Sequence, residues 1–267
     1  MRRLQVALVD EDGYGVTTTG RPPAFPVTVR GCLFDMDGVL TSTARLHADA
    51  WKATFDEFLA HRHPGSGEDD APFDVASDYR KLVDGRLRED GVRAFLASRD
   101  ISLPEGSSGD PPGEGSVHAL GESKNERLLR LLDERGVDVF SGSIDLVRAA
   151  RSAGLRTAVV SASANTAAVL ASAGITDLFD VVVDGIAAAE RHLSGKPSPE
   201  TYLAAASDLH ISASECAVFE DSVAGVQAGK AGGFGFVVGV DRDGNRSELL
   251  ENGATMVVDD LAELLPR

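Results

Sequence analysis

The run Val27-Thr28-Val29-Arg30-Gly31-Cys32-Leu33-Phe34, followed at once by Asp35-Met36-Asp37-Gly38, decides the fold. The run is short, rich in β-branched and apolar residues, and stops at an aspartate, which is typical of a strand buried on both faces of a parallel sheet. In open sheets of this kind, ligands bind just outside the carboxyl ends of the strands. Residues 27–34 are therefore predicted to form the first strand, and Asp35 and Asp37 are candidates for the chemistry of the protein.

The part of the chain after Phe140 alternates short apolar runs with helical patterns. We expect strands at 157–160, 181–183, 217–219, 236–240 and 256–258. We expect helices that start at Ser141 or Ser143 and end at Gly154, that run over 165–174, and that start at Ser198 with Pro199 in the first helical position. This alternation predicts an α/β fold with a doubly wound parallel sheet, a Rossmann-like core.

The part of the chain between the first strand and Phe140 shows helical spacing and no strand pattern. Helices are expected at 44–62, 76–99 and 122–135, and breaker-rich segments at 63–72 and 104–121 are typical of surface loops. Residues 1–26, with scattered glycines and a proline pair, are expected to form a loosely ordered leader. The sequence thus predicts an α/β core of residues 27–43 and 140–267 and an inserted all-helical cap domain of residues 44–139.

The charge of the chain restricts its partners. It has 26 Lys and Arg residues against 42 Asp and Glu residues, a formal net charge of −16, which repels nucleic acid and anionic membranes. Its two cysteines, Cys32 and Cys216, border apolar runs and fit a reducing compartment. Acidic residues 10–12 interrupt the apolar start before a secretory segment could form, and no run is long and apolar enough to span a membrane. We expect a cytoplasmic monomer that binds a small molecule.

Polar residues follow the predicted strands and place the candidate chemistry at one edge of the sheet. Carboxylates with one lysine and one hydroxyl are typical of a hard oxygen site for Mg²⁺ beside a phosphate. An Asp-x-Asp-Gly sequence alone is more often a turn, and a serine after a strand is often a helix N-cap, but polar motifs at successive strand ends favour a site. In chain order the candidates are Asp35, Asp37, Ser161, Lys196, Glu220 and Asp221.

At these residues the sequence resembles the haloacid dehalogenase superfamily of phosphotransferases. The motifs are Phe-Asp-Met-Asp-Gly-Val-Leu at 34–40, Val-Ser-Ala-Ser at 160–163, Gly-Lys-Pro-Ser-Pro-Glu at 195–200 and Phe-Glu-Asp-Ser-Val-Ala-Gly at 219–225. The resemblance implies that Asp35 attacks phosphorus, that Asp37 is the general acid and base, and that Ser161 and Lys196 hold the phosphoryl group. It also implies that Mg²⁺ is bound by the Asp35 carboxylate, the Asp37 carbonyl and Asp221, with Glu220 close by.

The predicted cap domain is similar to that of the β-phosphoglucomutase-like subfamily, through residues 40–51 and 83–90. This likeness implies that His47 assists Asp37 and that Arg88 binds the phosphate that is not transferred. A small phosphorylated sugar is then the expected ligand. The remaining implied substrate contacts are Gly38, Thr43, Trp51, Gly85, Lys124, Asn125, Ser163 and Asn165.

Two departures from the subfamily pattern leave the exact reaction open. Ala164 stands where a lysine usually helps to hold the distal phosphate, and Ser42 stands where an aspartate is usual. The hypotheses are a β-phosphoglucomutase, a Mg²⁺-dependent sugar-phosphate phosphatase, and a non-catalytic phosphosugar-binding protein.

Three of the predicted cap residues also have simpler interpretations. His47 taken alone is more often an ordinary surface or core histidine, and Trp51 is more often part of the packing of the cap than a ligand contact. Arg88 is consistent with an ion pair to Glu89 or to another carboxylate of the cap.

Overall fold

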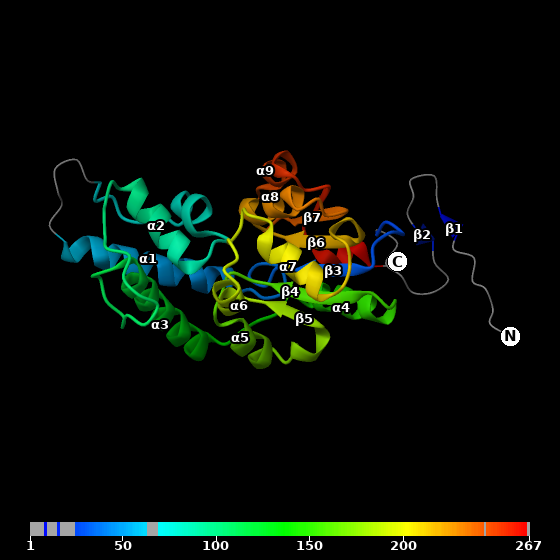
Figure 1. The fold of residues 1–267 in the computed structure, drawn as a ribbon, viewed down its shortest axis with the longest axis horizontal. Coiled ribbons are helices and arrows are strands. Elements are labelled where there is room, and N and C mark those ends of the chain that lie inside the picture. The colour runs from blue at the N-terminus through cyan, green and yellow to red at the C-terminus, as the bar shows by residue number, and fades with distance from the viewer. Residues whose placement is uncertain (1–7, 10–14, 17–24, 63–68, 243, 266–267) are drawn as a thin grey trace. The chain divides into compact units, whose positions relative to one another are not determined.

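The computed structural model describes residues 8–9, 15–16, 25–62, 69–242 and 244–265. The chain divides into two compact units, a sheet unit of residues 1–41 and 139–267 and a helical unit of residues 42–138 (Figure 1). Within the predicted leader, β1 (Leu8–Val9) pairs antiparallel with β2 (Gly15–Val16), and the rest of residues 1–24 lies outside the described residues.

The sheet unit is built on six parallel strands in the order β5-β4-β3-β6-β7-β8. The strands are parallel because their connections cross over through helical segments, and the order reverses direction between β3 and β6, as in a doubly wound sheet. The predicted α/β fold with a parallel sheet is therefore confirmed. The strands are β3 (Gly31–Phe34), β4 (Arg156–Val160), β5 (Val181–Val183), β6 (Cys216–Glu220), β7 (Phe236–Val240) and β8 (Met256–Val258).

Helices pack along the strands of this sheet. α7 packs against β3, β4 and β5, and α8 packs against β6 and β7, as Figure 1 shows. The α-helices of the unit are α4 (Ser141–Ser152), α5 (Thr166–Ser172), α6 (Gly185–Glu190), α7 (Glu200–Asp208), α8 (Val223–Ala231) and α9 (Arg246–Asn252).

The two faces of the sheet are set by the alternation of side chains along each strand. Leu33 and Val218 belong to one buried cluster together with Tyr202 of α7. Phe34 and Phe219 point to the other face, where their rings stack 4.5 Å apart. Residues two positions beyond Leu33 and Val218, which are Asp35 and Glu220, therefore lie on the face that α7 covers.

The helical unit contains α1 (Ala44–His61), a short π-helix η1 (Tyr79–Val83), α2 (Arg88–Ser98) and α3 (Val117–Arg135). Its core is aromatic: Phe55 stacks on Phe95 with the ring centroids 3.7 Å apart, and Trp51 stacks on Phe55 at 4.9 Å. A smaller apolar cluster of Leu46, Ala50 and Leu128 joins α1 to α3.

Two predicted helices of this unit are wrong in extent. The helix expected over 76–99 is interrupted after Val83, since Gly85 has a φ of +68°, a value that glycine adopts readily and that does not occur inside an α-helix. The helix expected over 122–135 begins at Val117, because the Ser116 hydroxyl caps it by accepting a hydrogen bond from the Ala119 N–H at 3.0 Å. The preceding loop is correspondingly shorter than 104–121.

Helix and strand starts in the sheet unit also differ from expectation. β3 begins at Gly31 and not at Val27, because the Val29 N–H turns back to the Pro26 carbonyl. α4 begins at Ser141, but neither Ser141 nor Ser143 is its N-cap, which is Phe140. Pro199 precedes the first helical residue of α7 instead of occupying it. Each of these is a local shift at an element end, where assignments are least certain from sequence.

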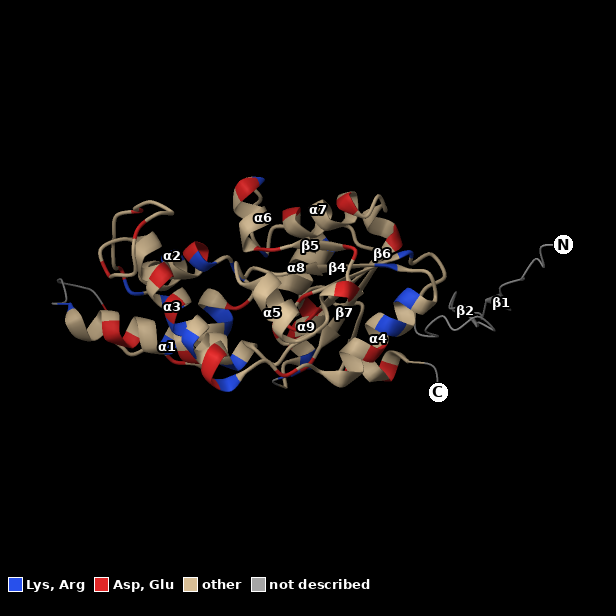
Figure 2. Cartoon of the chain, turned by 90° about the horizontal axis from the view of Figure 1, so that it is seen from below, with Lys and Arg blue, Asp and Glu red and all other residues tan. Residues whose placement is uncertain are grey.

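Charged side chains are distributed over the helices of both units, with acidic residues in excess (Figure 2). Among the described residues, no helix has the length and apolar character required to cross a bilayer.

Candidate active site at the carboxyl edge of the sheet

The candidate nucleophile Asp35 is held at the end of β3 by the sheet itself. Its N–H donates to the Phe219 carbonyl at 3.0 Å, and the chain then folds into a turn in which the Gly38 N–H donates to the Thr41 carbonyl at 2.8 Å. Gly38 has a φ of +87°, and a Cβ at this position would collide with the Asp221 carboxylate. Glycine is therefore required here for two reasons, its backbone conformation and the close approach of Asp221.

Lys196 joins the two buried carboxylates of the site. Its ammonium group forms ion pairs with Asp35 Oδ1 and Glu220 Oε1 and lies 3.5 Å from the Val160 carbonyl oxygen. From sequence, Lys196 is expected to follow the strand at 181–183 directly. This expectation is inaccurate: Asp184 and α6 follow that strand, and Lys196 lies in the later loop that leads to α7. The predicted proximity of Lys196 to Asp35 is nevertheless found.

Burial and the neighbouring charges shift the pKa values of both Asp35 and Lys196. Burial raises the pKa of the Asp35 carboxyl well above its usual value, while the Lys196 ammonium acts in the opposite direction. Burial alone would lower the pKa of Lys196, but Asp35 and Glu220 outweigh it and raise the pKa of the ammonium group above its usual value. Lys196 is therefore a permanent positive charge at this site at physiological pH.

Glu220 is held by four hydrogen-bond donors. Its Oε1 accepts from Lys196 and from the Tyr202 hydroxyl at 2.8 Å, and its Oε2 accepts from the Ser222 N–H at 3.2 Å and the Ser222 hydroxyl at 2.9 Å. A Cβ at Gly225, in the first turn of α8, would collide with this carboxylate. The start of α8 is thus shaped to receive Glu220.

The residues present fit a divalent metal ion. Asp35, Glu220 and Asp221 each offer a carboxylate oxygen, and these oxygens lie within 4.8 Å of one another. Hard oxygen ligands of this kind suit Mg²⁺. Asp221 is the least buried of the three, and Glu220 could act as a ligand only by giving up one of the hydrogen bonds that hold it.

The hydroxyl groups after β4 form a compact turn. Pairing of Phe34 with Val159 brings Ser161, one residue beyond β4, to the same edge of the sheet as Asp35. Ser161 is buried and its Oγ accepts from the Ser163 N–H at 3.1 Å, while the Ser163 Oγ accepts from the Asn165 N–H at 3.2 Å. The alternative role of Ser161 as a helix N-cap is wrong, because Asn165 occupies that position in α5.

Three residues that contact this site were not singled out from sequence. Besides Tyr202 and Ser222, Arg242 follows β7 and its Nε donates to the Gly38 carbonyl at 2.8 Å, while its guanidinium group stacks on Phe140 at 3.6 Å. Arg242 could have been found because it follows the carboxyl end of a predicted strand. Tyr202 could not, since its position within a helix gives no sign that its hydroxyl reaches a carboxylate.

In the helical unit, His47, Trp51 and Lys124 lie together. Lys124 is buried, its ammonium group is 3.1 Å from His47 Nδ1 and it lies 4.9 Å from the centre of the Trp51 ring. An ammonium group only donates, so His47 Nδ1 accepts and the proton of the neutral imidazole is on Nε2. Trp51 is almost fully buried, as expected for packing.

Arg88, the candidate ligand for a distal phosphate, already has two carboxylate partners. Its Nε is 2.9 Å from Glu89 Oε1 and its Nη1 is 3.0 Å from Glu122 Oε2. Arg88 is the first residue of α2, directly after the interruption at Gly85, and Asn125 donates to the other oxygen of Glu122 at 3.0 Å. Thr43, by contrast, is buried at the start of α1, where its carbonyl accepts from the His47 N–H.

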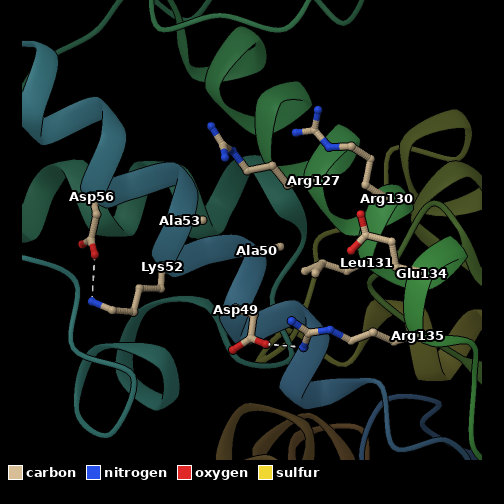
Figure 3. Close-up of a pocket in the computed structure, with 10 residues that line it drawn as sticks. All are labelled: Asp49, Ala50, Lys52, Ala53, Asp56, Arg127, Arg130, Leu131, Glu134 and Arg135. Atoms are coloured by element: carbon tan, nitrogen blue, oxygen red, sulfur yellow. Dashed lines mark hydrogen bonds and ion pairs between the residues drawn. The ribbon is translucent and has the colours of Figure 1, made fainter.

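A separate hollow of about 510 Å³ lies between α1 and α3 within the helical unit (Figure 3). Arg135 of α3 pairs with Asp49 of α1 across it, and Lys52 pairs with Asp56 along α1, both at 2.7 Å (Figure 3). None of the candidate site residues lines it, and its charges largely neutralise each other. The residues around it are Asp49, Ala50, Lys52, Ala53, Asp56, Arg127, Arg130, Leu131, Glu134 and Arg135.

Comparisons with known proteins identify the family of the chain. Residues 29–233 match the family described as haloacid dehalogenase-like hydrolase. The chain is 50% identical over 243 residues, 90% of this chain and 93% of the relative, to a protein of Mycobacterium tuberculosis named beta-phosphoglucomutase.

Two solved structures have the same fold. A beta-phosphoglucomutase from Clostridium difficile superposes with a TM-score of 0.69 at 27% identity, over 88% of this chain and 93% of the other. CbbY of Rhodobacter sphaeroides, solved in complex with xylulose-(1,5)bisphosphate, gives a TM-score of 0.67 at 27% identity, over 88% and 96%. The chain belongs to the haloacid dehalogenase-like hydrolase family, within its β-phosphoglucomutase-like subfamily, and is a phosphotransferase or phosphatase.

Proposed function

We propose that the protein is a β-phosphoglucomutase, which converts β-D-glucose 1-phosphate into glucose 6-phosphate through a phosphorylated Asp35 and a β-glucose 1,6-bisphosphate intermediate. The observation that carries the proposal is the Asp35–Lys196–Glu220 arrangement in a chain that is 50% identical, over nearly its whole length, to relatives named beta-phosphoglucomutase. The Asp35–Lys196 pair supports transfer of a phosphoryl group, and the names of the relatives support a sugar hydroxyl as the acceptor.

In the first half of the reaction, phosphorylated Asp35 gives its phosphoryl group to the 6-hydroxyl of β-glucose 1-phosphate. Asp37 removes the proton of that hydroxyl, the bond between phosphorus and the Asp35 oxygen breaks, and the bisphosphate forms. In the second half an Asp35 oxygen attacks the phosphorus at position 1. Asp37 returns its proton to the departing sugar oxygen, which leaves glucose 6-phosphate and renews the phosphorylated enzyme.

The other residues of the sheet unit hold charge during these steps. Lys196, positively charged and buried, compensates the negative charge of the transferring group, and Ser161 donates to one of its oxygens. We propose that Mg²⁺ binds the Asp35 and Asp221 carboxylates and the Asp37 carbonyl, with Glu220 nearby. When bound there, the ion would reduce the electrostatic repulsion between the Asp35 carboxylate and a phosphate dianion.

The proposal also covers contacts with the sugar and its second phosphate. We propose that Arg88 binds the phosphate that is not transferred, since its planar group can form two parallel bonds to phosphate oxygens. His47 is proposed to assist Asp37. The remaining contacts with the substrate are proposed for Gly38, Thr43, Trp51, Gly85, Lys124, Asn125, Ser163 and Asn165.

A phosphatase is the second candidate, and it is favoured by two specific observations. Arg88 is engaged by Glu89 and Glu122, and Ala164 lacks the positive charge that is usual at that position in the subfamily. If the distal phosphate is bound weakly, water would accept the phosphoryl group from phosphorylated Asp35.

The two candidates give different products. The purified protein is incubated with β-glucose 1-phosphate, Mg²⁺ and a trace of the 1,6-bisphosphate, and the products are followed by phosphorus NMR. Glucose 6-phosphate without accumulation of inorganic phosphate supports the mutase. Stoichiometric inorganic phosphate would establish the phosphatase instead, and Asp35→Asn is the control that should give neither product.

A further inference from the structure

A buried tyrosine outside the four motifs contacts both charged partners of the nucleophile. Tyr202 lies in α7 and is fully buried, its hydroxyl donates to Glu220 Oε1 at 2.8 Å, and its ring lies 5.2 Å from the Lys196 ammonium group. A phenylalanine would fill the same apolar space without a polar group that needs a partner in the core. The hydroxyl is therefore not explained by packing.

The position of Glu220 explains what the hydroxyl does. The carboxylate is completely buried, and each of its oxygens accepts two hydrogen bonds, so every acceptor position is filled. Ser222 fixes Oε2 from the start of α8, whereas Tyr202 is the uncharged donor that fixes Oε1. Since Lys196 shares Oε1 with Tyr202, the direction in which this oxygen points sets where the ammonium group is held.

Lys196 is shared between two carboxylates, and this makes its position sensitive to Glu220. The ammonium group pairs with Asp35 on one side and with Glu220 on the other. Without the hydrogen bond from the Tyr202 hydroxyl, Lys196 would be the only donor to Glu220 Oε1. The charge of that oxygen would then attract the ammonium group more strongly and shift it away from Asp35. Displacements of about 1 Å at a reacting centre can lower turnover by about 10²-fold.

We propose that Tyr202 is a positioning residue for phosphoryl transfer: its hydroxyl holds Glu220, and Glu220 in turn holds the Lys196 ammonium group against Asp35. The proposal rests on the part of the proposed function in which Asp35 accepts a phosphoryl group, and it does not depend on whether sugar or water is the final acceptor. Tyr202 itself touches neither substrate nor reacting atoms in this role.

The test uses Tyr202→Phe, which removes only the hydroxyl, and acetyl phosphate as a substrate that phosphorylates Asp35 without a sugar. We expect kcat for acetyl phosphate turnover to fall by about 10–100-fold, with KM changed less than about twofold, because binding of the substrate is not affected. Tyr79→Phe is the matched control, since the Tyr79 hydroxyl donates to the Ala44 carbonyl at 3.3 Å in the helical unit. It should leave both constants unchanged.

A double-mutant cycle separates this role from a general loss of stability. If the hydroxyl acts through Glu220, then Tyr202→Phe combined with Glu220→Gln should be no slower than Glu220→Gln alone. When Tyr202→Phe is instead combined with Ser161→Ala, the fold decreases in kcat of the two single variants should multiply. Turnover of Tyr202→Phe within twofold of the wild type, or multiplying effects with Glu220→Gln, would overturn the proposal.

A second variant covers the case in which Tyr202→Phe does not fold. Ser222→Gly removes the hydroxyl that donates to Glu220 Oε2, keeps the backbone donor, and retains a residue type that is acceptable at a helix N-cap. We expect a smaller fall in kcat, about threefold to tenfold, again without a change in KM. An unchanged kcat in this folded variant would also contradict the view that the orientation of Glu220 controls Lys196. If acetyl phosphate supports no turnover in the wild type, the proposed function fails first, and this outcome is distinct from a failure of the Tyr202 proposal.

Discussion

The two units use their charged residues differently. In the sheet unit, buried charges converge: the Lys196 ammonium group pairs with Asp35, which follows β3, and with Glu220, the last residue of β6. In the helical unit, the charged candidates pair with side chains of the same unit, Arg88 with Glu89 and Glu122 and Lys124 with His47. Under the proposed function, the first arrangement serves phosphoryl transfer, and a phosphate bound by Arg88 would have to replace its carboxylate partners.

This difference indicates where the reaction is decided. In the proposed mechanism, transfer of the phosphoryl group depends on residues of the sheet unit. We propose that the choice between sugar and water as the acceptor depends on whether Arg88 exchanges its carboxylate partners for a phosphate. Single substitutions in each unit test this separation.

Replacing the nucleophile should have the largest effect. Asp35→Asn keeps the size of the side chain but removes the carboxylate that forms the acyl phosphate. Turnover of sugar phosphates and of acetyl phosphate should both be abolished, and intact-protein mass spectrometry should find no phosphorylated species. A phosphorylated form of this variant would show that another residue is the nucleophile.

Replacing the acid and base should slow transfer without removing the metal. Asp37→Asn should reduce transfer to a sugar hydroxyl by roughly 10²–10⁴-fold, because no base remains to take the proton. Its affinity for Mg²⁺, measured by calorimetry, should be nearly unchanged, since the backbone carbonyl is the proposed ligand there. A severe loss of affinity would instead make the Asp37 side chain a ligand.

The tight turn at Gly38 gives the next largest effect. Gly38→Ala introduces a methyl group that collides with the Asp221 carboxylate, at a backbone φ of +87° that alanine adopts poorly. We expect turnover to fall by about 10²-fold and Mg²⁺ binding to weaken, because Asp221 must move.

Gly109→Ala is the matched control for Gly38→Ala. Nothing lies within 4 Å of a Cβ at Gly109, so this variant should behave as the wild type. Gly38→Ala with unaltered turnover and metal binding would show that Asp221 is not confined by the turn.

The smallest and most informative effect concerns Arg88. If Arg88 binds the distal phosphate, Arg88→Lys should lower mutase turnover by at least about tenfold while acetyl phosphate turnover stays nearly unchanged. If Arg88 only forms ion pairs with Glu89 and Glu122, both activities should change slightly and equally, since partly exposed pairs contribute less than about 1 kcal/mol. The second outcome would favour the phosphatase.

The sequence was sufficient for the sheet and for the groups at its edge because both follow from local patterns. A buried β-branched run that stops at a polar residue identifies the end of a strand, and parallel strands bring such ends together. These patterns alone predict that one edge of the sheet carries Asp35, Ser161, Glu220 and Asp221.

What the sequence could not predict depends on contacts between distant segments. The helix is interrupted at Gly85 because of the positive φ of that residue, and α3 starts as early as Val117 because Ser116 caps it. Weak helical periodicity in the sequence reveals neither feature. The pairing of Arg88 with Glu122 joins two helices, and the reach of Tyr202 to Glu220 joins a helix to a strand. Such choices of partner are fixed by packing in three dimensions.

The most direct test of the central claim is to locate the phosphoryl group on the protein. The wild type is mixed with acetyl phosphate and Mg²⁺, quenched within milliseconds, reduced with borohydride to trap an acyl phosphate, and digested for peptide mass spectrometry. We expect the modification on Asp35, and we expect that addition of glucose 1-phosphate before the quench removes it while bisphosphate forms. A modification on any other residue, or none under conditions of full turnover, would contradict it.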